Sequence, residues 1–397
     1  MQRLVPLSVL LAFSVVLARA DTVLVLPFFR QSPSAGLEWI GESVAQTVAE
    51  ALTAHGLLVL GREDRQEAFR RLSIRPNAPL THASVIKVAD TLDATDVIYG
   101  QFEFTPPPAG APAGSRGSLQ FTAWTLNMRR MRNGPDFIES GPLDDLAAMQ
   151  THLAWQVLAY LDPAHALPAS QFIKDHPPVR LDAMENYTRG LLATGAEQKH
   201  RYFTQAARLD EGFWQPVFQL GRLYWVQKEY RLAADWFAKV KPGTPRYFEA
   251  TFLLGLCRYY TGDYAAAQRA FDTVAQSVPL NEVFNNLGAA ESRRDLPNAI
   301  GDLRKALDGD PADPDYQFNI GYVEWKRGDF ASAEESFQAV LARNPNDAQA
   351  AQLLERCRQK SGPRAADLKP GFERIKLNYE EEAWRQLKLA LEGKKSP

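Results

Sequence analysis

One short pattern recurs through the second half of the 397-residue chain. It is marked by glycines 34, 33 and 33 residues apart, with one more glycine 31 residues ahead of them. An alanine, a large apolar residue and a proline follow each of the four evenly spaced glycines in phase. The four glycine landmarks are Gly221, Gly255, Gly288 and Gly321, and the leading one is Gly190. Landmarks in phase over several units predict a stack of similar structural units.

The pattern resembles the tetratricopeptide repeat, a helix-turn-helix unit of about 34 residues. Its small residues let the two helices of a unit approach closely, its aromatic residue fills the gap, and its proline ends the second helix. The resemblance predicts an all-α superhelix of about four repeats plus a lone helix over residues 181–360. Residues 361–397 are expected to form a linker and a helix, starting near Glu380, that caps the apolar end of the stack.

First helices line the concave surface in this repeat family, so their recurring rows supply the candidate binding residues. Aromatic residues dominate the rows that lie three residues before and four residues after each glycine, and Asn285 and Ser292 interrupt these rows at the third unit. This resembles a groove for a protein or peptide partner with aromatic shelves and one polar break. The candidates are Phe218, Arg222, Trp225, Phe252, Tyr259, Asn285, Asn286, Phe318, Asn319, Tyr322 and Trp325.

The same rows have a second interpretation, because aromatic residues at helical spacing are also typical of packing between neighbouring units. Asn285 and Asn286 favour binding, since adjacent amides in an apolar row can hydrogen-bond a peptide backbone. The Lys and Asn pattern with which chaperone-binding members clamp a terminal carboxylate is absent from these rows. Capture of a chain's terminal carboxylate is therefore not expected.

Residues 21–161 alternate short apolar runs with amphipathic stretches, which predicts a small α/β domain. We expect strands at 22–29, 57–60, 97–104, 119–128 and 137–140, and helices at 37–52, 63–72, 85–92 and 146–161. Residues 162–180 contain four prolines and are expected to be a linker between two folding units.

This order of segments resembles the TolB amino-terminal-like domain, which is related to the CsgG and FlgO envelope proteins. The resemblance includes Val-Leu-Val-Leu-Pro-Phe-Phe at 23–29, Glu-Trp-Ile-Gly-Glu at 38–42, Leu-Gly-Arg at 60–62 and Asp-Val-Ile-Tyr-Gly at 96–100. It implies a docking module, of the bacterial envelope or of signalling proteins, without shared catalytic residues, and an envelope protein is the partner expected for it here. The overall expectation is an α+β two-domain protein, a small α/β domain followed by the superhelix.

The first twenty residues are typical of a cleaved secretory signal peptide. Arg3 precedes an apolar run over 4–17, and Ala-Arg-Ala at 18–20 supplies the small residues that a signal peptidase reads. An apolar run of that length rises only about 21 Å as a helix, short of a bilayer core of about 30 Å. We therefore expect an exported protein, periplasmic if the source is Gram-negative, with no transmembrane segment in the mature chain. Asp21 in place of a lipidated cysteine argues against a lipoprotein pore.

Composition and motifs argue against other classes of function. The 45 basic and 47 acidic residues nearly balance, so nucleic acid is not an expected partner. Six scattered histidines and two cysteines predict no metal site, and no cofactor motif is present. We interpret the chain as an exported non-catalytic adaptor. An oligomeric envelope secretion or assembly accessory, and an enzyme with its site in the N-terminal domain, remain alternatives.

Overall fold

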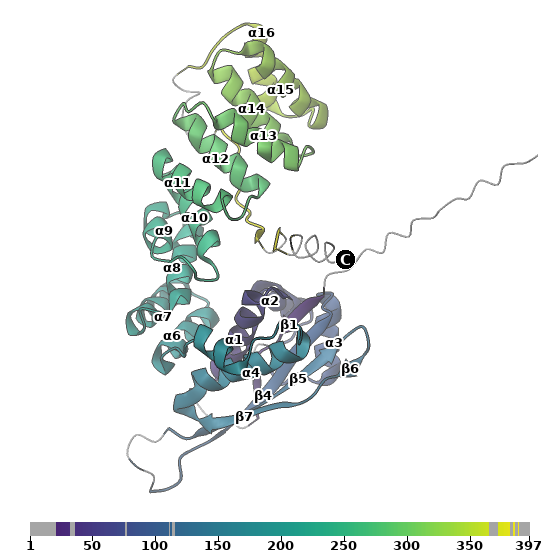
Figure 1. The fold of residues 1–397 in the computed structure, drawn as a ribbon, viewed down its shortest axis with the longest axis vertical. Helices are drawn as coiled ribbons and strands as arrows, with labels where there is room; N and C mark the ends of the chain where they lie inside the picture. Colours follow the sequence, from purple (N-terminus) through teal and green to yellow (C-terminus); the bar gives the residue numbers. More distant parts are fainter. Residues whose placement is uncertain are drawn as a thin grey trace, which may run out of the picture.

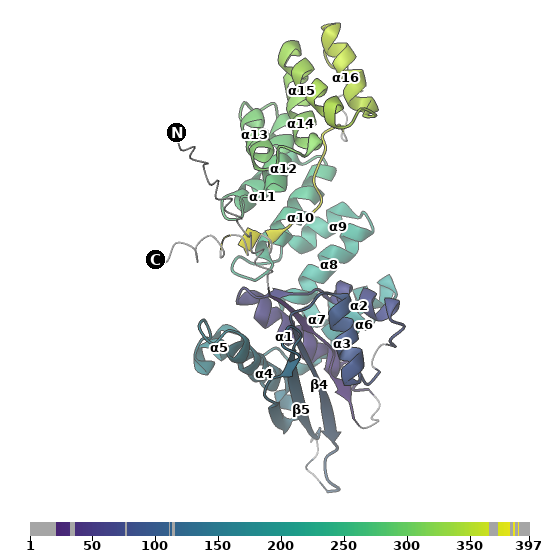
Figure 2. The ribbon, with the colours of Figure 1, turned by 90° about the vertical axis from the view of Figure 1, so that its right-hand side faces the viewer.

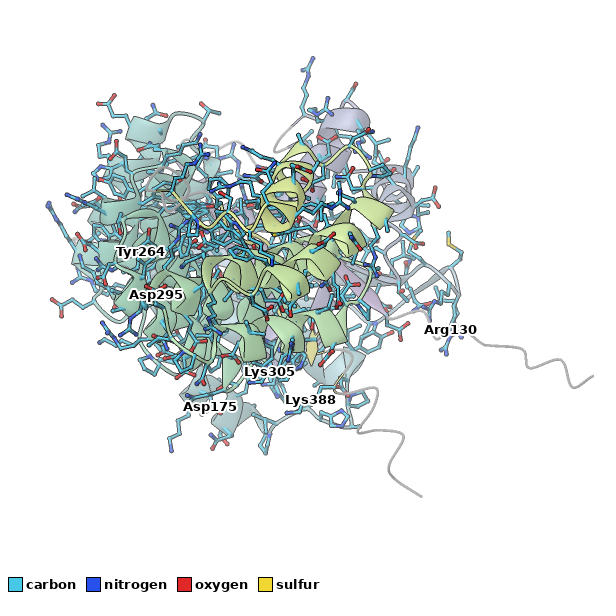
Figure 3. All side chains as sticks on the ribbon, turned by 90° about the horizontal axis from the view of Figure 1, so that it is seen from above. Arg130, Asp175, Tyr264, Asp295, Lys305 and Lys388 are labelled. Atoms are coloured by element: carbon cyan, nitrogen blue, oxygen red, sulfur yellow. The ribbon has the colours of Figure 1, made fainter. Side chains whose placement is uncertain are left out.

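The computed structural model of the chain describes residues 21–31, 36–75, 78–110, 112, 116–364, 372–381, 384–385 and 388. The predicted signal peptide lies outside the described residues. The molecule is elongated, with an α/β unit at one end and a stack of helices that extends away from it (Figure 1). Figure 3 looks down the long axis and shows Arg130, in the α/β unit, on the opposite side from Tyr264 in the stack. The α/β unit is thus offset to one side of the stack.

A mixed sheet forms the centre of the α/β unit. Its strands are β1 (Thr22–Val25), β2 (Phe29–Arg30), β3 (Leu58–Val59), β4 (Asp96–Thr105), β5 (Ser118–Asn127), β6 (Arg132–Asn133) and β7 (Phe137–Pro142). β1 pairs in parallel with β3 and β4, and β5 lies antiparallel to β4 and β7. The strand expected over 22–29 is divided into β1 and β2 because Pro27 has no N–H to donate, and the next N–H, of Phe28, bonds to Gly41 of the following helix.

Helices cover both faces of this sheet. They are α1 (Ile40–Ala54), α2 (Arg62–Arg71), α3 (His82–Thr91) and α4 (Leu146–Leu161). Val23 and Val25 of β1 pack in the cluster that contains α1 and α4, whereas Leu24 and Leu26 pack in the cluster that contains α2 and α3. This alternation follows from the two-residue period of a strand. The apolar run that begins at Thr22 is therefore buried on both faces of the sheet.

Residues 162–180 differ from the expected linker, because they are packed against the α/β unit. They contain a helix, α5 (Ala169–Asp175), whose Phe172 is fully buried and stacks on His176 and on His55, the residue that follows α1. Pro168 stands immediately before this helix, where a missing N–H costs no helical hydrogen bond. Met184, in the first helix of the stack, belongs to the same core. The prolines end helices here, and the residues between them are packed against the α/β unit and do not form a loose linker.

The stack consists of successive antiparallel helix pairs. They are α6 (Leu181–Leu192) with α7 (Ala196–Leu209), α8 (Trp214–Val226) with α9 (Tyr230–Phe237), α10 (Tyr247–Tyr260) with α11 (Tyr264–Ala275), α12 (Asn281–Arg293) with α13 (Ala299–Gly309), and α14 (Pro314–Lys326) with α15 (Phe330–Arg343), followed by α16 (Ala348–Arg358). A Cβ at Gly221 would lie 2.6 Å from the ring of Phe237, and one at Gly255 would lie 2.7 Å from the ring of Phe271. The recurring glycine and the recurring aromatic residue are therefore the two sides of one helix contact.

The chain turns back after α16. Residues 372–380 run in extended form beside α14, α12 and α10 toward the α/β unit, and helical geometry begins at Glu381 (Figures 1 and 2). The guanidinium of Arg385 donates to the carbonyl of Thr53, at the last turn of α1, at 3.1 Å. Among the described residues, no helix is long and apolar enough to cross a membrane.

The expectation that the C-terminal helix caps the stack is wrong for the described residues. Trp384 packs instead against the cluster formed by α8 to α12. The outer face of α16 already exposes Gln352, Glu355 and Arg358, so the end of the stack is polar without a further cover.

Candidate peptide-binding groove

The first helices α10, α12 and α14 form a groove that holds residues 372–379 of the same chain, here named the resident segment (Figure 2). The segment runs from α14 toward α10, opposite to the order of the helices. Glu373 is 5% exposed, although it lies outside any regular element. The groove is thus a surface that already buries an extended peptide.

Asparagines on two successive repeats hold the backbone of the resident segment. Asn319 accepts from the N–H of Arg374 at 2.8 Å and donates to its carbonyl at 3.0 Å. Asn286 makes the same two bonds to Lys376, at 2.9 and 2.8 Å. The two clamped residues are two apart because alternate residues of an extended chain present their backbone groups to the same side. These contacts recognise backbone atoms, which every peptide carries.

Asn285 connects the two clamps. Its Nδ2 donates to the carbonyl of Arg374 at 2.8 Å and to Oδ1 of Asn286 at 3.1 Å. Its Oδ1 accepts from Nδ2 of Asn319 at 2.7 Å. All three asparagines are fully buried, and their amides satisfy one another or the segment, as buried polar groups require.

A buried cation and a phenol receive the acidic side chain of the segment. Arg293 and Glu373 form an ion pair in which the side chains are 5% and 0% exposed. The hydroxyl of Tyr259 donates to the same carboxylate at 3.0 Å. Burial raises the pKa of Glu373, and the Arg293 guanidinium opposes that rise. Burial also raises the pKa of Tyr259, which keeps its phenol protonated as a donor.

Three carboxylates receive the two basic side chains of the segment. Arg374 lies 3.7 Å from the centre of the Phe318 ring and pairs with Asp315 at 3.2 Å and Asp347 at 2.6 Å. The ammonium of Lys376 contacts Asp313 and Asp315, each at 2.6 Å. Burial lowers the pKa of Lys376, but the hydrogen bonds to these carboxylates outweigh burial, so its pKa is raised.

Aromatic rings hold the two ends of the resident segment. Phe372 stacks on Tyr322 with ring centres 5.5 Å apart and planes 13° apart. Tyr379 stacks on Phe252 with centres 5.0 Å apart. Between them the side chain of Leu377 is 52% exposed and faces away from the groove. The groove therefore contacts some positions of the segment and leaves others to solvent.

Seven of the residues predicted for the groove contact the resident segment: Phe252, Tyr259, Asn285, Asn286, Phe318, Asn319 and Tyr322. Phe218 does not, because it is buried against Phe237 of its own helix pair. Trp325 is also buried, and its indole N–H donates to the carbonyl of Ser361 at 2.8 Å, where the chain leaves α16.

The other two predicted residues lie on α8, close to the α/β unit. Arg222 forms an ion pair with Glu63 of α2 at 3.5 Å. Trp225 belongs to an aromatic cluster with Tyr230 and Tyr260, at 5.2 and 6.0 Å between ring centres. Residues at equivalent positions of the repeats therefore contact different partners along the stack, since the resident segment lies on α10, α12 and α14 and not on α8.

Sequence reasoning missed the charged residues of the groove and the segment that fills it. Asp313 and Asp347 precede helices and accept hydrogen bonds from the first-turn amides of α14 and α16, so their sequence signal was that of N-caps. Arg293 lies in the last turn of α12, where a basic residue also suits the helix dipole. The acidic residue at 373 and the basic residues at 374 and 376 were the available signal of complementarity.

A separate cleft of about 1160 Å³ lies where the α/β unit meets the first helix pairs. Polar contacts cross it, including Gln215 to Glu50 at 2.8 Å and the pair of Arg222 with Glu63. Although burial raises the pKa of Glu63, its own backbone and the guanidinium of Arg222 lower it overall. Polar contacts therefore join the two units across this cleft.

The fold and the groove define a helical-repeat protein that holds an extended segment along its first helices. Sequence models of the tetratricopeptide repeat match residues 218–282, 252–314 and 292–357. The chain therefore contains tetratricopeptide repeats, and the matched family is not a catalytic one.

Several solved structures are similar to parts of the chain. MamA (residues 41 to the end) from Desulfovibrio magneticus RS-1 is 24% identical over 42% of this chain and 95% of its own, with a TM-score of 0.38. YrrB, described as a TPR protein with an unusual peptide-binding site, is 16% identical over 52% of this chain and 98% of its own, with a TM-score of 0.40. The lipoprotein GNA1162 from Neisseria meningitidis is 16% identical over 31% of this chain and 80% of its own, with a TM-score of 0.25. No curated protein matches the sequence.

Proposed function

We propose that this protein is an exported, non-catalytic adaptor whose tetratricopeptide groove binds an extended segment of a partner protein. The observation that carries the proposal is the pair of asparagine clamps, Asn286 and Asn319, each of which bonds both the N–H and the C=O of one peptide residue. Such contacts suit an extended backbone supplied by any chain. Export rests on the residues of the predicted signal peptide.

A partner competes with the resident segment for the groove. The segment is attached to α16 by about a dozen residues, and a short tether of this kind gives an effective concentration in the millimolar range. A free partner therefore binds well only if it makes better contacts or if the resident segment is weakened. The groove is in this sense occupied by default.

The α/β unit is proposed as a second docking module, with an envelope protein as its partner. The resemblance of its segment order to the TolB amino-terminal-like domain supports this role. Its strand β7 pairs on one side with β5, and Ile138 on that strand is 55% exposed. An exposed apolar side chain on a strand of this kind suits contact with another protein.

A fluorescent peptide with the sequence of residues 372–381, the segment peptide, tests the groove. The receptor is the full-length chain with Glu373→Ala, which removes the buried carboxylate of the resident segment. Titration by fluorescence anisotropy is expected to give saturable binding, and adding Asn286→Leu is expected to weaken it at least tenfold, since two hydrogen bonds of about 1 kcal/mol each are lost. The matched control is Asn378→Ala in the receptor, which replaces an exposed asparagine of the resident segment. Absence of binding, in a folded receptor whose 374 and 376 amides exchange freely, would refute the proposal.

A further inference from the structure

The charges of the groove carry more information than its asparagines. Along residues 372–376 the side chains are aromatic, acidic, basic, apolar and basic, and all but the apolar one meet an aromatic ring or a group of opposite charge in the groove. We propose that the groove selects partner segments with this succession: an aromatic residue, an acidic residue and a basic residue, followed two positions later by a second basic residue. This inference rests on the proposed function and specifies its partner.

The acidic position is the most restricted. The carboxylate of Glu373 is 0% exposed and its partner Arg293 is 5% exposed, so water cannot substitute for either group. A cation taken out of water needs a compensating anion nearby. The hydroxyl of Tyr259 adds a donor to the same oxygen atom. A segment with an amide or a base at this position therefore leaves the Arg293 charge without that carboxylate.

The basic positions face carboxylates that are fixed in place. Asp313 and Asp347 each accept a hydrogen bond from an amide in the first turn of a helix, so neither turns away without losing that bond. Asp315 lies between them and contacts both Arg374 and Lys376. An acidic residue at either position would add a negative charge to a cluster that already holds three carboxylates. The groove thus excludes uniformly acidic segments as firmly as uniformly basic ones.

The asparagine clamps set the spacing of this pattern. Asn319 holds the backbone of Arg374 and Asn286 holds that of Lys376, so the chain cannot slide by one residue without losing both clamps. Position 375 faces the apolar core of α8 to α12, whereas position 377 is exposed. The acidic pocket and the basic pockets therefore act at fixed distances along the bound chain.

Variants of the segment peptide test the pattern on the full-length Glu373→Ala receptor. Replacing the acidic residue of the peptide by Gln is expected to weaken binding at least tenfold, and by Lys at least a hundredfold. Replacing both basic residues by Glu is expected to abolish binding. Replacing the residue that corresponds to exposed Leu377 by Ala is expected to change the Kd less than twofold. A receptor that also carries Arg293→Met is expected to bind the Glu and Gln peptides equally.

The outcomes separate this inference from the proposed function. Equal binding of the native, Gln and charge-reversed peptides would overturn the pattern and leave a groove that binds extended chains of any sequence. Failure of every peptide to bind would overturn both. A dimer that forms in the wild-type chain without peptide, and that Glu373→Ala abolishes, would identify a second copy as the source of the segment and overturn an external partner. If Glu373→Ala loses helical circular dichroism, Lys376→Ala serves as the receptor.

Discussion

The asparagine clamp on α12 gives a quantitative prediction. Asn286→Leu removes two hydrogen bonds to the backbone of Lys376, and leucine is an acceptable residue there because the equivalent position of the preceding repeat is Leu253. Each bond contributes about 1 kcal/mol net, and a backbone group left buried without a partner costs about 1–3 kcal/mol. The resident segment is therefore expected to be held about 2–3 kcal/mol less tightly.

Hydrogen exchange measures this loss directly. The N–H groups of Arg374 and Lys376 are bonded to side chains and not to a regular element, so their protection reports on the groove alone. A loss of 2–3 kcal/mol corresponds to exchange of the 376 amide about 30- to 150-fold faster. Circular dichroism is expected to show the same helix content, because the contacts within the helix pairs are unchanged.

Asn378→Ala is the control for the exchange experiment, since this asparagine lies on the same segment but is exposed. Its effect on the 374 and 376 amides is expected to be less than twofold. Unchanged exchange in Asn286→Leu would refute the inference that the clamp holds the segment. Loss of protection throughout α12 and α14 would instead show that the substitution acts on the helices and not on the groove.

Three further predictions concern stability. Glu373→Gln breaks a buried ion pair, so urea denaturation is expected to show a loss of up to about 3–5 kcal/mol, less if the segment leaves the groove first; an unchanged midpoint would contradict it. Burial and the nearby Asp302 raise the pKa of Glu291 on α12 from 4.5 to about 7. The contribution of Glu291 to the free energy of unfolding is therefore fully present below about pH 4.5 and is lost as pH rises through 7. Glu291→Gln is expected to flatten the fall in urea midpoint between about pH 5 and 8, and an unaltered pH profile would contradict this prediction. In Gly221→Ala the new Cβ would lie 2.6 Å from an aromatic ring, so the free energy of unfolding is expected to fall by about 1–3 kcal/mol. Gly301 has open space around it, so Gly301→Ala is expected to raise the free energy of unfolding by up to about 1 kcal/mol. Equal effects of the two substitutions would refute the close-contact argument.

The repeat array was predictable from the sequence because its packing is local and periodic. Each repeat glycine faces a large apolar side chain 13 to 16 positions later, which is an aromatic ring in four units and Leu303 in the unit of Gly288. Local contacts leave a pattern of fixed spacing, which a single sequence displays. The positions of Asn286 and Asn319 within the first-helix rows follow from the same spacing.

The occupant of the groove was not predictable in this way. Lys376 and Asn286 are 90 residues apart, and their contact is not part of the repeat, so no periodic pattern in the sequence indicates it. The same holds for Phe172, whose burial against α1 converts an apparent linker into a packed layer. Prolines reveal where a helix ends, but only tertiary packing decides whether the residues between them are held.

The path of the C-terminal residues has a mechanical consequence. A stack of repeats bends easily, because each unit touches only its neighbours. Residues 372–379 contact α14, α12 and α10, and Arg385 bonds to Thr53 of α1, so the C-terminal part of the chain contacts distant points along the molecule. We expect these contacts to restrain the curvature of the superhelix and its angle to the sheet. A ligand that displaces the resident segment would also release the stiffness of the whole molecule, and small-angle scattering would record that release as a broader distribution of end-to-end lengths.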